Sequence, residues 1–173
     1  MGEAKLRQTE AGLEPEGKGW FVVNAAEAAG THTDDYGEGV RFEGAARFPG
    51  LGFNIRLLQP GQPSALYHRE SAAEAFLVLS GECTAVIEDQ ERTLRPGDLL
   101  YTPPGTAHVI VGAGDGPSVV VMAGARPAQP EINFPVSQVA AKYGASVDEE
   151  TDDMRVAYGE VRNFRPGRVE LSW

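Results

Sequence analysis

The sequence predicts an all-β fold of the barrel or sandwich kind, and two observations lead to that prediction. Short runs rich in Val, Ile, Leu and aromatic residues recur between turn-forming residues along the middle of the chain. Glycine occurs 21 times and proline 12 times in 173 residues, which suits a chain that reverses direction often. Many short strands at close spacing are typical of two packed sheets or a closed barrel.

The predicted strands follow one another from residue 51 to residue 122. They are Leu51 to Leu58, Ser64 to Glu70, Ala75 to Leu79, Glu82 to Ile87, Thr93-Leu94, Leu99 to Thr102, His108 to Val111 and Ser118 to Met122. Turns such as Pro60-Gly61, Ser80-Gly81 and Pro96-Gly97 stand between them, where proline restricts φ or glycine permits a positive φ. We expect the barrel to occupy residues 19–125.

The residues before the barrel have a different character. Residues 1–18 mix acidic and basic side chains without an apolar period, which predicts a mobile tail. The run Trp-Phe-Val-Val at residues 20–23 predicts one short strand. The Gly- and Asp-rich stretch that follows, up to residue 39, gives no clear pattern.

Residues 126–173 predict a helical and extended appendage that packs on the barrel. A short amphipathic helix ending at Gly144 is indicated by four apolar residues at helical spacing: Val136, Val139, Ala140 and Tyr143. Thr151 to Tyr158 is a second helical candidate. The last segment, Val161 to Trp173, has no period and is expected to lie on the barrel as an extended strap.

Charge and cysteine content exclude several classes of partner. Fifteen basic and 25 acidic residues give a net charge of −10, which repels nucleic acid and anionic membrane surfaces. The single Cys83 cannot form an internal disulfide, and the first residues are too polar for a signal peptide. We therefore expect a cytoplasmic protein that acts on a small molecule.

The most specific pattern lies in residues 97–112. Gly97 is followed after five residues by Pro-x-Gly and, after two more, by His108. This arrangement resembles the second motif of the cupin superfamily, in which a tight turn delivers one histidine into the barrel. The asparagine that the family carries after this histidine is replaced by Gly112.

Residues 61–81 resemble the first cupin motif, because Glu74 is followed after six residues by Gly81. Fifteen residues separate Gly81 from Gly97, as in the small bacterial single-barrel members of the cupin 2 type (monocupins). The resemblance implies a double-stranded β-helix, or jelly-roll, barrel that holds one divalent metal between its two motifs.

The first motif departs from the family in its histidines. Where the family usually has His-x-His before the glutamate, this chain reads Tyr67-His68-Arg69-Glu70. Alternate side chains of a strand face opposite sides, so either Tyr67 and Arg69 or His68 and Glu70 point inward. We take the second register, because it supplies two possible ligands and the first would put an arginine beside a cation.

The predicted metal ligands are His68, Glu70, Glu74 and His108. Two histidines with a carboxylate suit non-haem Fe(II), and Mn(II), Ni(II) and Zn(II) also accept these donors. If a reaction occurs there, Glu70 or Tyr101 is expected to carry a proton.

Cupins host many activities on one barrel, so the family leaves the function open. The first hypothesis is a metal-dependent enzyme, of the dioxygenase or isomerase type, that acts on a small polar or aromatic molecule. The alternative is a non-catalytic cupin that binds or senses a small molecule. A homodimer is expected from the family, with the strand at residues 20–23 pairing across chains.

Overall fold

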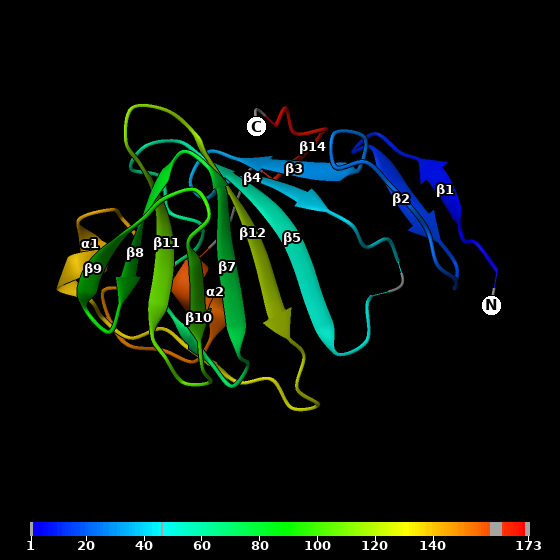
Figure 1. The fold of residues 1–173 in the computed structure, drawn as a ribbon. Helices are drawn as coiled ribbons and strands as arrows, with labels where there is room; N and C mark the ends of the chain where they lie inside the picture. Colours follow the sequence, from blue (N-terminus) through cyan, green and yellow to red (C-terminus); the bar gives the residue numbers. More distant parts are fainter. Residues whose placement is uncertain (1, 46, 160–163, 172–173) are drawn as a thin grey trace.

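A computed structural model describes residues 2–45, 47–159 and 164–171 of the protein. The middle of the chain forms a β-barrel, the N-terminal residues form a separate hairpin beside it, and the two short helices lie in the C-terminal segment (Figure 1). Among the described residues, no helix has the length and apolar character needed to cross a membrane.

The secondary structure is dominated by short strands. In chain order they are β1 (Lys5–Gln8), β2 (Leu13–Glu16), β3 (Ala29–Thr33), β4 (Gly37–Arg41), β5 (Leu51–Leu58), β6 (Arg69–Glu70), β7 (Glu74–Ser80), β8 (Glu82–Ile87), β9 (Gln90–Leu94), β10 (Leu99–Thr102), β11 (His108–Ala113), β12 (Ser118–Ala125), β13 (Ile132–Asn133) and β14 (Arg165–Pro166). The helices are α1 (Gln138–Ala141) and α2 (Met154–Tyr158).

Two antiparallel sheets form the barrel. The larger sheet has the strand order β10-β7-β12-β5-β4-β3-β14, and the smaller one has the order β11-β8-β9. Strand β12 lies between β5 and β7, and it pairs with β5 along eight residues. The chain passes repeatedly between the two sheets, as in a jelly roll, so the predicted fold class is confirmed.

Apolar side chains fill the space between the two sheets. Leu58, Val78 and Val120 of the larger sheet pack against Ala85 and Ile110 of the smaller one, and each is at most 1% exposed. This burial is the main source of stability, because each large aliphatic side chain contributes about 1.5–3 kcal/mol when it leaves water.

The outer faces of both sheets are covered as well. On the smaller sheet, Val86, Val109 and Val111 pack against Ala140 of α1. On the larger sheet, the alternate positions of β4, β5 and β12 pack against Val169 of the C-terminal segment; these positions are Val40, Ile55, Leu57 and Val119. Odd-numbered residues of β5 therefore face outward, and even-numbered residues face the barrel interior.

The prediction of a mobile tail over residues 1–18 is wrong, because these residues form the β1–β2 hairpin. Lys5 stands opposite Glu16, and Arg7 stands opposite Glu14, with 3.4 Å between the Arg7 Nη2 and Glu14 Oε2 atoms. The mixture of charges that suggested disorder thus places opposite charges on facing strand positions, where they attract one another.

The segment between this hairpin and the barrel also differs from the prediction. Residues 20–23 form no strand, and only Trp20 makes a bridge, with Glu3. The strands β3 and β4 lie instead in the Gly-rich stretch that follows. Glycine has low β-propensity, so a strand carrying Gly37 and Gly39 gives little pattern in sequence.

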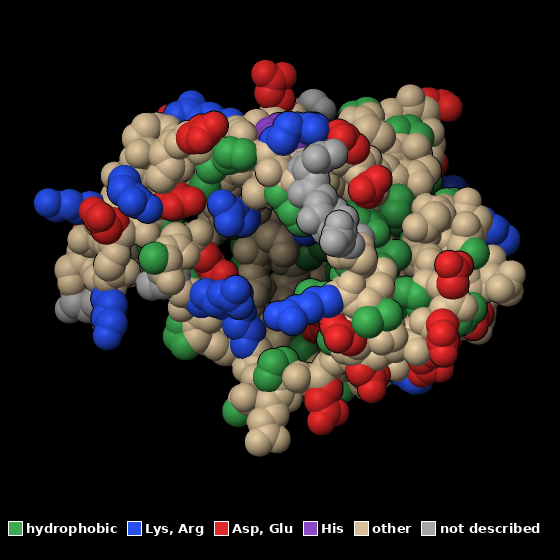
Figure 2. Space-filling view, turned by 180° about the vertical axis from the view of Figure 1, so that it is seen from behind, with side chains coloured by type: hydrophobic (Ala, Val, Ile, Leu, Met, Phe, Trp, Pro, Cys, Tyr) green, Lys and Arg blue, Asp and Glu red, His purple; other side chains and the backbone are tan. Residues whose placement is uncertain are grey.

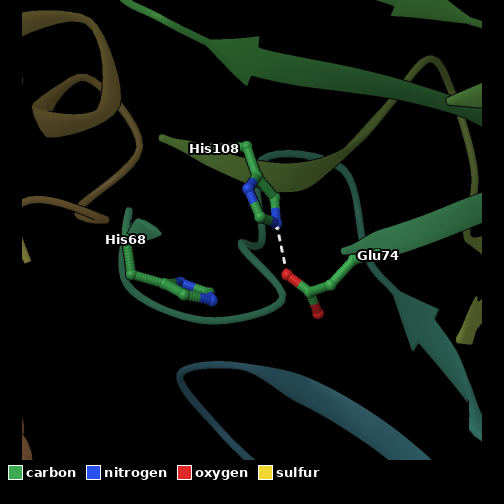
Figure 3. A group of neighbouring side chains, drawn as sticks. All are labelled: His68, Glu74 and His108. Atoms are coloured by element: carbon green, nitrogen blue, oxygen red, sulfur yellow. Dashed lines mark ion pairs between the residues drawn. The ribbon is translucent and has the colours of Figure 1, made fainter. Parts of the chain in front are cut away.

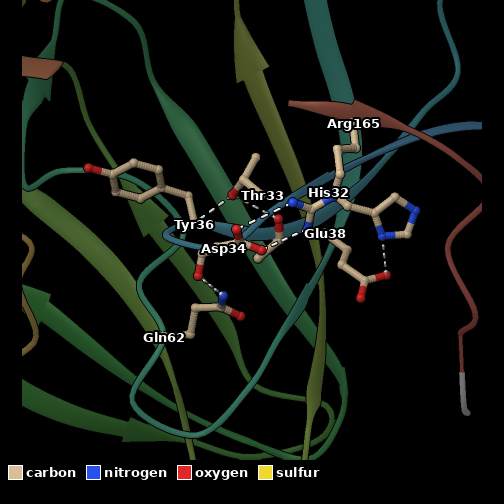
Figure 4. Close-up of polar contacts among 8 residues, drawn as sticks. His32, Thr33, Asp34, Tyr36, Glu38, Gln62 and Arg165 are labelled. Carbon is tan, nitrogen blue, oxygen red and sulfur yellow. Dashed lines mark hydrogen bonds and ion pairs between the residues drawn. The ribbon is translucent and has the colours of Figure 1, made fainter. Parts of the chain in front are cut away.

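The C-terminal segment is held on the β3–β4 hairpin by a polar cluster (Figure 4). Arg165 Nη2 of β14 lies 2.7 Å from Asp34 Oδ1, and Gln62 Nε2 donates to the Asp34 carbonyl oxygen at 2.9 Å. Beside them, His32 Nδ1 lies 3.2 Å from Glu38 Oε2. Helix α1, its stop at Gly144, and α2 fall in the predicted segments, whereas Val161 and Trp173 lie outside the described residues.

Gly112 stands where the chain leaves no room for a side chain. A Cβ at this position would lie 2.3 Å from the Gln59 carbonyl oxygen. Gly112 exchanges backbone hydrogen bonds with Gly61 and Gln62, at 2.7 and 2.9 Å. These bonds fix the two motif segments against each other without the asparagine of the family.

Candidate metal centre

Two histidines from distant parts of the chain stand directly opposite each other. His68, just before β6, and His108, the first residue of β11, exchange both backbone hydrogen bonds, at 3.1 and 2.8 Å. A pair bonded in this way presents its side chains on the same face. The two imidazole rings are consequently neighbours, with centroids 5.2 Å apart.

The backbone also fixes the tautomer of each ring. His68 Nδ1 lies 2.6 Å from the Leu66 carbonyl oxygen, and His108 Nδ1 lies 3.0 Å from the Thr106 carbonyl oxygen. A carbonyl only accepts, so each Nδ1 carries the proton and donates it. In the neutral rings, Nε2 therefore has a free lone pair, which is the state a metal ligand needs.

A carboxylate completes the group. Glu74 is the first residue of β7, and its Oε2 lies 3.0 Å from His108 Nε2. Gly124 faces it from β12, where a Cβ would come within 3.4 Å of Glu74 Oε1, so the glycine leaves space for the carboxylate. Figure 3 shows the three side chains pointing toward one another.

The group fits a metal ion. One ligand atom from each of His68, Glu74 and His108 lies within 4.8 Å of the others. Among the described residues, Glu74 Oε2 is buried and has no hydrogen-bond partner. A buried carboxylate oxygen facing a neutral imidazole lone pair is unfavourable unless a proton or a cation lies between them. A divalent ion would satisfy all three ligands at once.

Aromatic rings hold the two histidines in place. Phe76, on β7, packs edge-on against His108 with centroids 5.1 Å apart, and Phe134 lies 5.9 Å from His68. Both phenylalanines are buried. Phe134 was not among the candidates from sequence, since nothing local distinguishes a supporting ring from any other core residue.

The comparisons with known proteins agree with this geometry. The family model described as the cupin domain matches residues 54–124, which include His68, Glu74 and His108. The chain contains a cupin domain. The resemblance seen in the two sequence motifs is thereby confirmed, and cupins commonly bind a metal.

Two similar proteins illustrate the extent of the match. The auxin-binding protein ABP19b of Prunus persica is 33% identical over an alignment of 109 residues, which covers 57% of this chain and 52% of that protein. The chain thus spans about half the length of this curated relative. A sugar phosphate isomerase of the cupin superfamily from Silicibacter pomeroyi is 26% identical, with a TM-score of 0.50 over 55% of this chain and 62% of that one.

The cupin barrel places Glu70 beside the three-residue group and not within it. Glu70 Oε1 lies 3.5 Å from His68 Nε2. On the opposite side of the strand, Arg69 points outward and bonds Asn133 and Glu150, while Tyr67 is buried beneath α1. This is the register that the sequence favoured, and the role of Glu70 as a ligand stays a prediction.

His68 and Glu70 change each other's acidity. Burial pushes the pKa of His68 down, but the hydrogen bond with Glu70 and the Leu66 carbonyl outweigh it, so the pKa is raised above its usual value. The same hydrogen bond with His68 lowers the pKa of Glu70, against the effect of burial. Glu70 is therefore a carboxylate near neutral pH, able to accept a proton.

The structure does not bring Tyr101 into this site. Its side chain is 60% exposed on the outer face of β10, while Thr102, the next residue, is buried. Tyr101 lines neither the cavity beside His68 nor the cavity beside Glu74. The prediction that it carries a proton there fails because the parity of β10 turns it away from the barrel.

A cavity of about 680 Å³ adjoins the candidate metal centre. His68 and Glu70 line it on the barrel side, and Arg56 of β5 also faces it. The C-terminal segment supplies Tyr158 and Phe164 as part of the opposite wall. The C-terminal segment thus lines part of the cavity, whose volume suits a small molecule.

Proposed function

We propose that the protein is a metal-dependent enzyme of the isomerase type, acting on a small hydroxylated molecule, with the ion held by His68, Glu74 and His108. The observation that carries the proposal is the buried Glu74 Oε2, which has no hydrogen-bond partner among the described residues and faces the Nε2 atom of His108, with the His68 ring beside it. This is an arrangement that a cation would complete. Fe, Mn, Ni and Zn all suit the donors.

The protein's own residues would then do the proton chemistry. A bound divalent ion would supply Lewis acidity toward a carbonyl or hydroxyl oxygen of the substrate. Glu70 lies at the border of the group and lines the adjacent cavity, and its lowered pKa keeps it ionised. It is placed to take a proton from the hydroxyl-bearing carbon next to the carbonyl and to return it to the former carbonyl carbon, while the hydroxyl proton passes to the former carbonyl oxygen.

The likeness to the sugar phosphate isomerase of Silicibacter pomeroyi supports this reaction class over oxygen chemistry. The cavity beside the site is also of a size to hold such a molecule, and Tyr158 and Phe164 line one side of it.

The experiment is deuterium incorporation from D2O. Protein reconstituted with each of Fe, Mn, Ni and Zn is incubated with a panel of aldoses, ketoses and their phosphates, and NMR detects exchange next to the carbonyl. We expect exchange that needs metal and falls at least tenfold in Glu70→Gln. Failure to take up any of the four metals would refute the proposal.

A second candidate is an oxygenase, since two histidines and a carboxylate with open positions also suit Fe(II) and O₂. Oxygen consumption in the Fe-loaded protein, without deuterium exchange, would favour it. A third is a non-catalytic binding protein, supported by the name of the Prunus persica relative. Metal and ligand binding by calorimetry, with neither reaction, would favour that one.

The association of two copies also stays a proposal. Residues 20–23 form no strand, so they cannot pair with a second copy as the sequence suggested. The surface proposed instead is β10, an edge strand on which Leu99 is 65% exposed and Tyr101 is 60% exposed. Exposed apolar side chains on a sheet edge favour pairing with a second copy. Light scattering that detects a dimer, weakened by Leu99→Lys, would support this surface.

A further inference from the structure

Arg56 is a charged side chain that faces the barrel interior. It lies on β5 between Ile55 and Leu57, which face outward, so its own side chain faces inward. Among the described residues, none forms a hydrogen bond or an ion pair with the Arg56 guanidinium, and Tyr158 is the one titratable side chain that acts on it. Burial lowers the pKa of Arg56, but an arginine remains charged at neutral pH.

A glycine on the neighbouring strand leaves room for this guanidinium. Gly39 of β4 stands opposite Arg56 in the sheet, and a Cβ at Gly39 would lie 3.0 Å from Arg56 Nη1. A larger residue at this position would push the guanidinium aside. The unpaired charge is costly to bury, and a structure retains such a group where a ligand of opposite charge can pair with it.

A second unsatisfied polar group lies two residues away. Asn54 faces inward from the same strand, and its Oδ1 is buried with no hydrogen-bond partner among the described residues. Two residues along a strand are about 7 Å apart, so one small ligand can reach both side chains. The amide oxygen accepts a hydroxyl proton, and the guanidinium binds an anion in two parallel hydrogen bonds.

The surroundings of Arg56 are cationic in a chain whose net charge is −10. A cavity of about 370 Å³ next to it is lined by Asn54, one acidic residue, Glu43, and four arginines: Arg41, Arg47, Arg56 and Arg126. Arg126 and Arg41 are neutralised by Glu43 and Glu14. Figure 2 shows a face of the molecule that is hollowed near its centre, with Lys and Arg side chains along part of the rim.

We propose that Arg56 and Asn54 form the recognition site for the anionic end of the ligand, a phosphate or a carboxylate on a hydroxylated molecule. Arg56 also lines the 680 Å³ cavity that reaches His68 and Glu70. A ligand anchored at Arg56 therefore extends its other end toward the candidate metal centre. This inference rests on the proposed function for the reaction at that end, and the anion site itself is testable without a metal.

The test is an NMR titration of the metal-free protein with inorganic phosphate and, separately, acetate. It is run at about pH 8, where ordinary histidines are neutral and do not bind anions. The arginine Nε–Hε signal that is missing in Arg56→Gln is assigned to Arg56. We expect this signal to shift and to saturate, and phosphate or acetate binding to weaken at least tenfold in Arg56→Gln. Arg92→Gln, an exposed arginine of β9, is the control and should change nothing.

A second variant, Asn54→Asp, keeps the inference testable if Arg56→Gln folds poorly. Asn54→Asp keeps the shape and supplies Arg56 with an internal partner, so phosphate binding should weaken in this variant too. A response to phosphate alone or to acetate alone identifies the anionic group. No saturable shift with either anion, or an equal loss in Arg92→Gln, would overturn the inference. Metal uptake measured on the same variants tests the proposed function separately, and we expect it to be unchanged in Arg56→Gln.

Discussion

The inward positions of three barrel strands change from apolar to polar within a few residues. On β5, Leu58 is fully buried among aliphatic side chains, whereas Arg56 faces a cavity. On β7 the same change runs from Val78 to Glu74, and on β11 it runs from Ile110 to His108. In each strand the polar residue is nearer the N-terminal end.

The difference shows how one barrel separates stability from chemistry. The side chains at the apolar positions are close-packed, and their burial stabilises the fold. The polar positions include a buried oxygen of Glu74 and one of Asn54 that no described residue satisfies. Groups left in this state lower stability, and they occur where a ligand or ion completes them.

The largest effect on stability is expected at the apolar positions. Leu58→Ala removes a fully buried side chain and leaves a cavity, so the free energy of unfolding should fall by about 2–5 kcal/mol. Urea unfolding measures this loss. Metal affinity of the folded variant should be unchanged, and a parallel loss of metal affinity would mean that the two regions are not separable.

The polar positions should behave in the opposite way. Glu74→Gln should weaken metal binding at least tenfold, about 1.4 kcal/mol, while the metal-free protein loses no stability, because a buried unsatisfied charge is removed. Glu70→Gln should weaken metal binding less than Glu74→Gln does. Metal dissociation constants for both variants measure this difference. An equal loss of metal affinity in the two would make Glu70 a ligand, as the sequence suggested.

The ion pair between Glu43 and Arg126, at the cationic cavity beside Arg56, should make the free energy of unfolding depend on pH. Hydrogen bonds from Arg126, at 2.7 Å, lower the pKa of Glu43. A lowered pKa in the folded protein stabilises it above the usual carboxyl pKa, and the contribution is lost as the pH falls through and below that value. Glu43→Gln should therefore cost about 1 kcal/mol at neutral pH.

Urea unfolding of both proteins over a range of pH measures this difference, which should vanish in acid, below about pH 3. A difference that persisted in acid would show that the pair acts through packing and not through the charge of Glu43.

The smallest effect is expected at Tyr101. Tyr101→Phe removes a hydroxyl from an exposed side chain on the outer face of β10, so stability should change by less than about 0.5 kcal/mol. Metal affinity and anion binding should stay as they are. Calorimetric titration checks this, and a lost activity or affinity would restore Tyr101 to the site.

Much of the barrel was predictable because its strands carry local patterns. The bounds of β5, β8 and β10 match the predicted runs, since β5 and β10 are framed by Pro and Gly turns and β8 lies between Gly81 and the Glu88-Asp89 turn. Strands β3 and β4 were missed because glycine obscures the pattern, and the β1–β2 hairpin was missed because its pairing is between polar residues. The run Ser64 to Glu70 forms only β6 and one isolated bridge, at His68.

The candidate site was predictable where a motif fixes the spacing, and less so elsewhere. His68, Glu74 and His108 were found through the two motifs and strand parity. The alternation of side chains along β10 also turns Tyr101 away from the site. Which residues of β10 face inward depends on its pairing with β7, and the sequence does not define that pairing. The space for the Arg56 guanidinium depends on Gly39 across the sheet, a tertiary contact with no local pattern.

The most direct test of the account is the metal content of the purified protein. Elemental analysis without chelators, followed by titration with Fe, Mn, Ni and Zn, should find about one divalent ion per chain. The variant His68→Ala with His108→Ala should bind none and keep its β-sheet circular dichroism. A wild-type protein that neither contains nor takes up any of these metals would contradict the account.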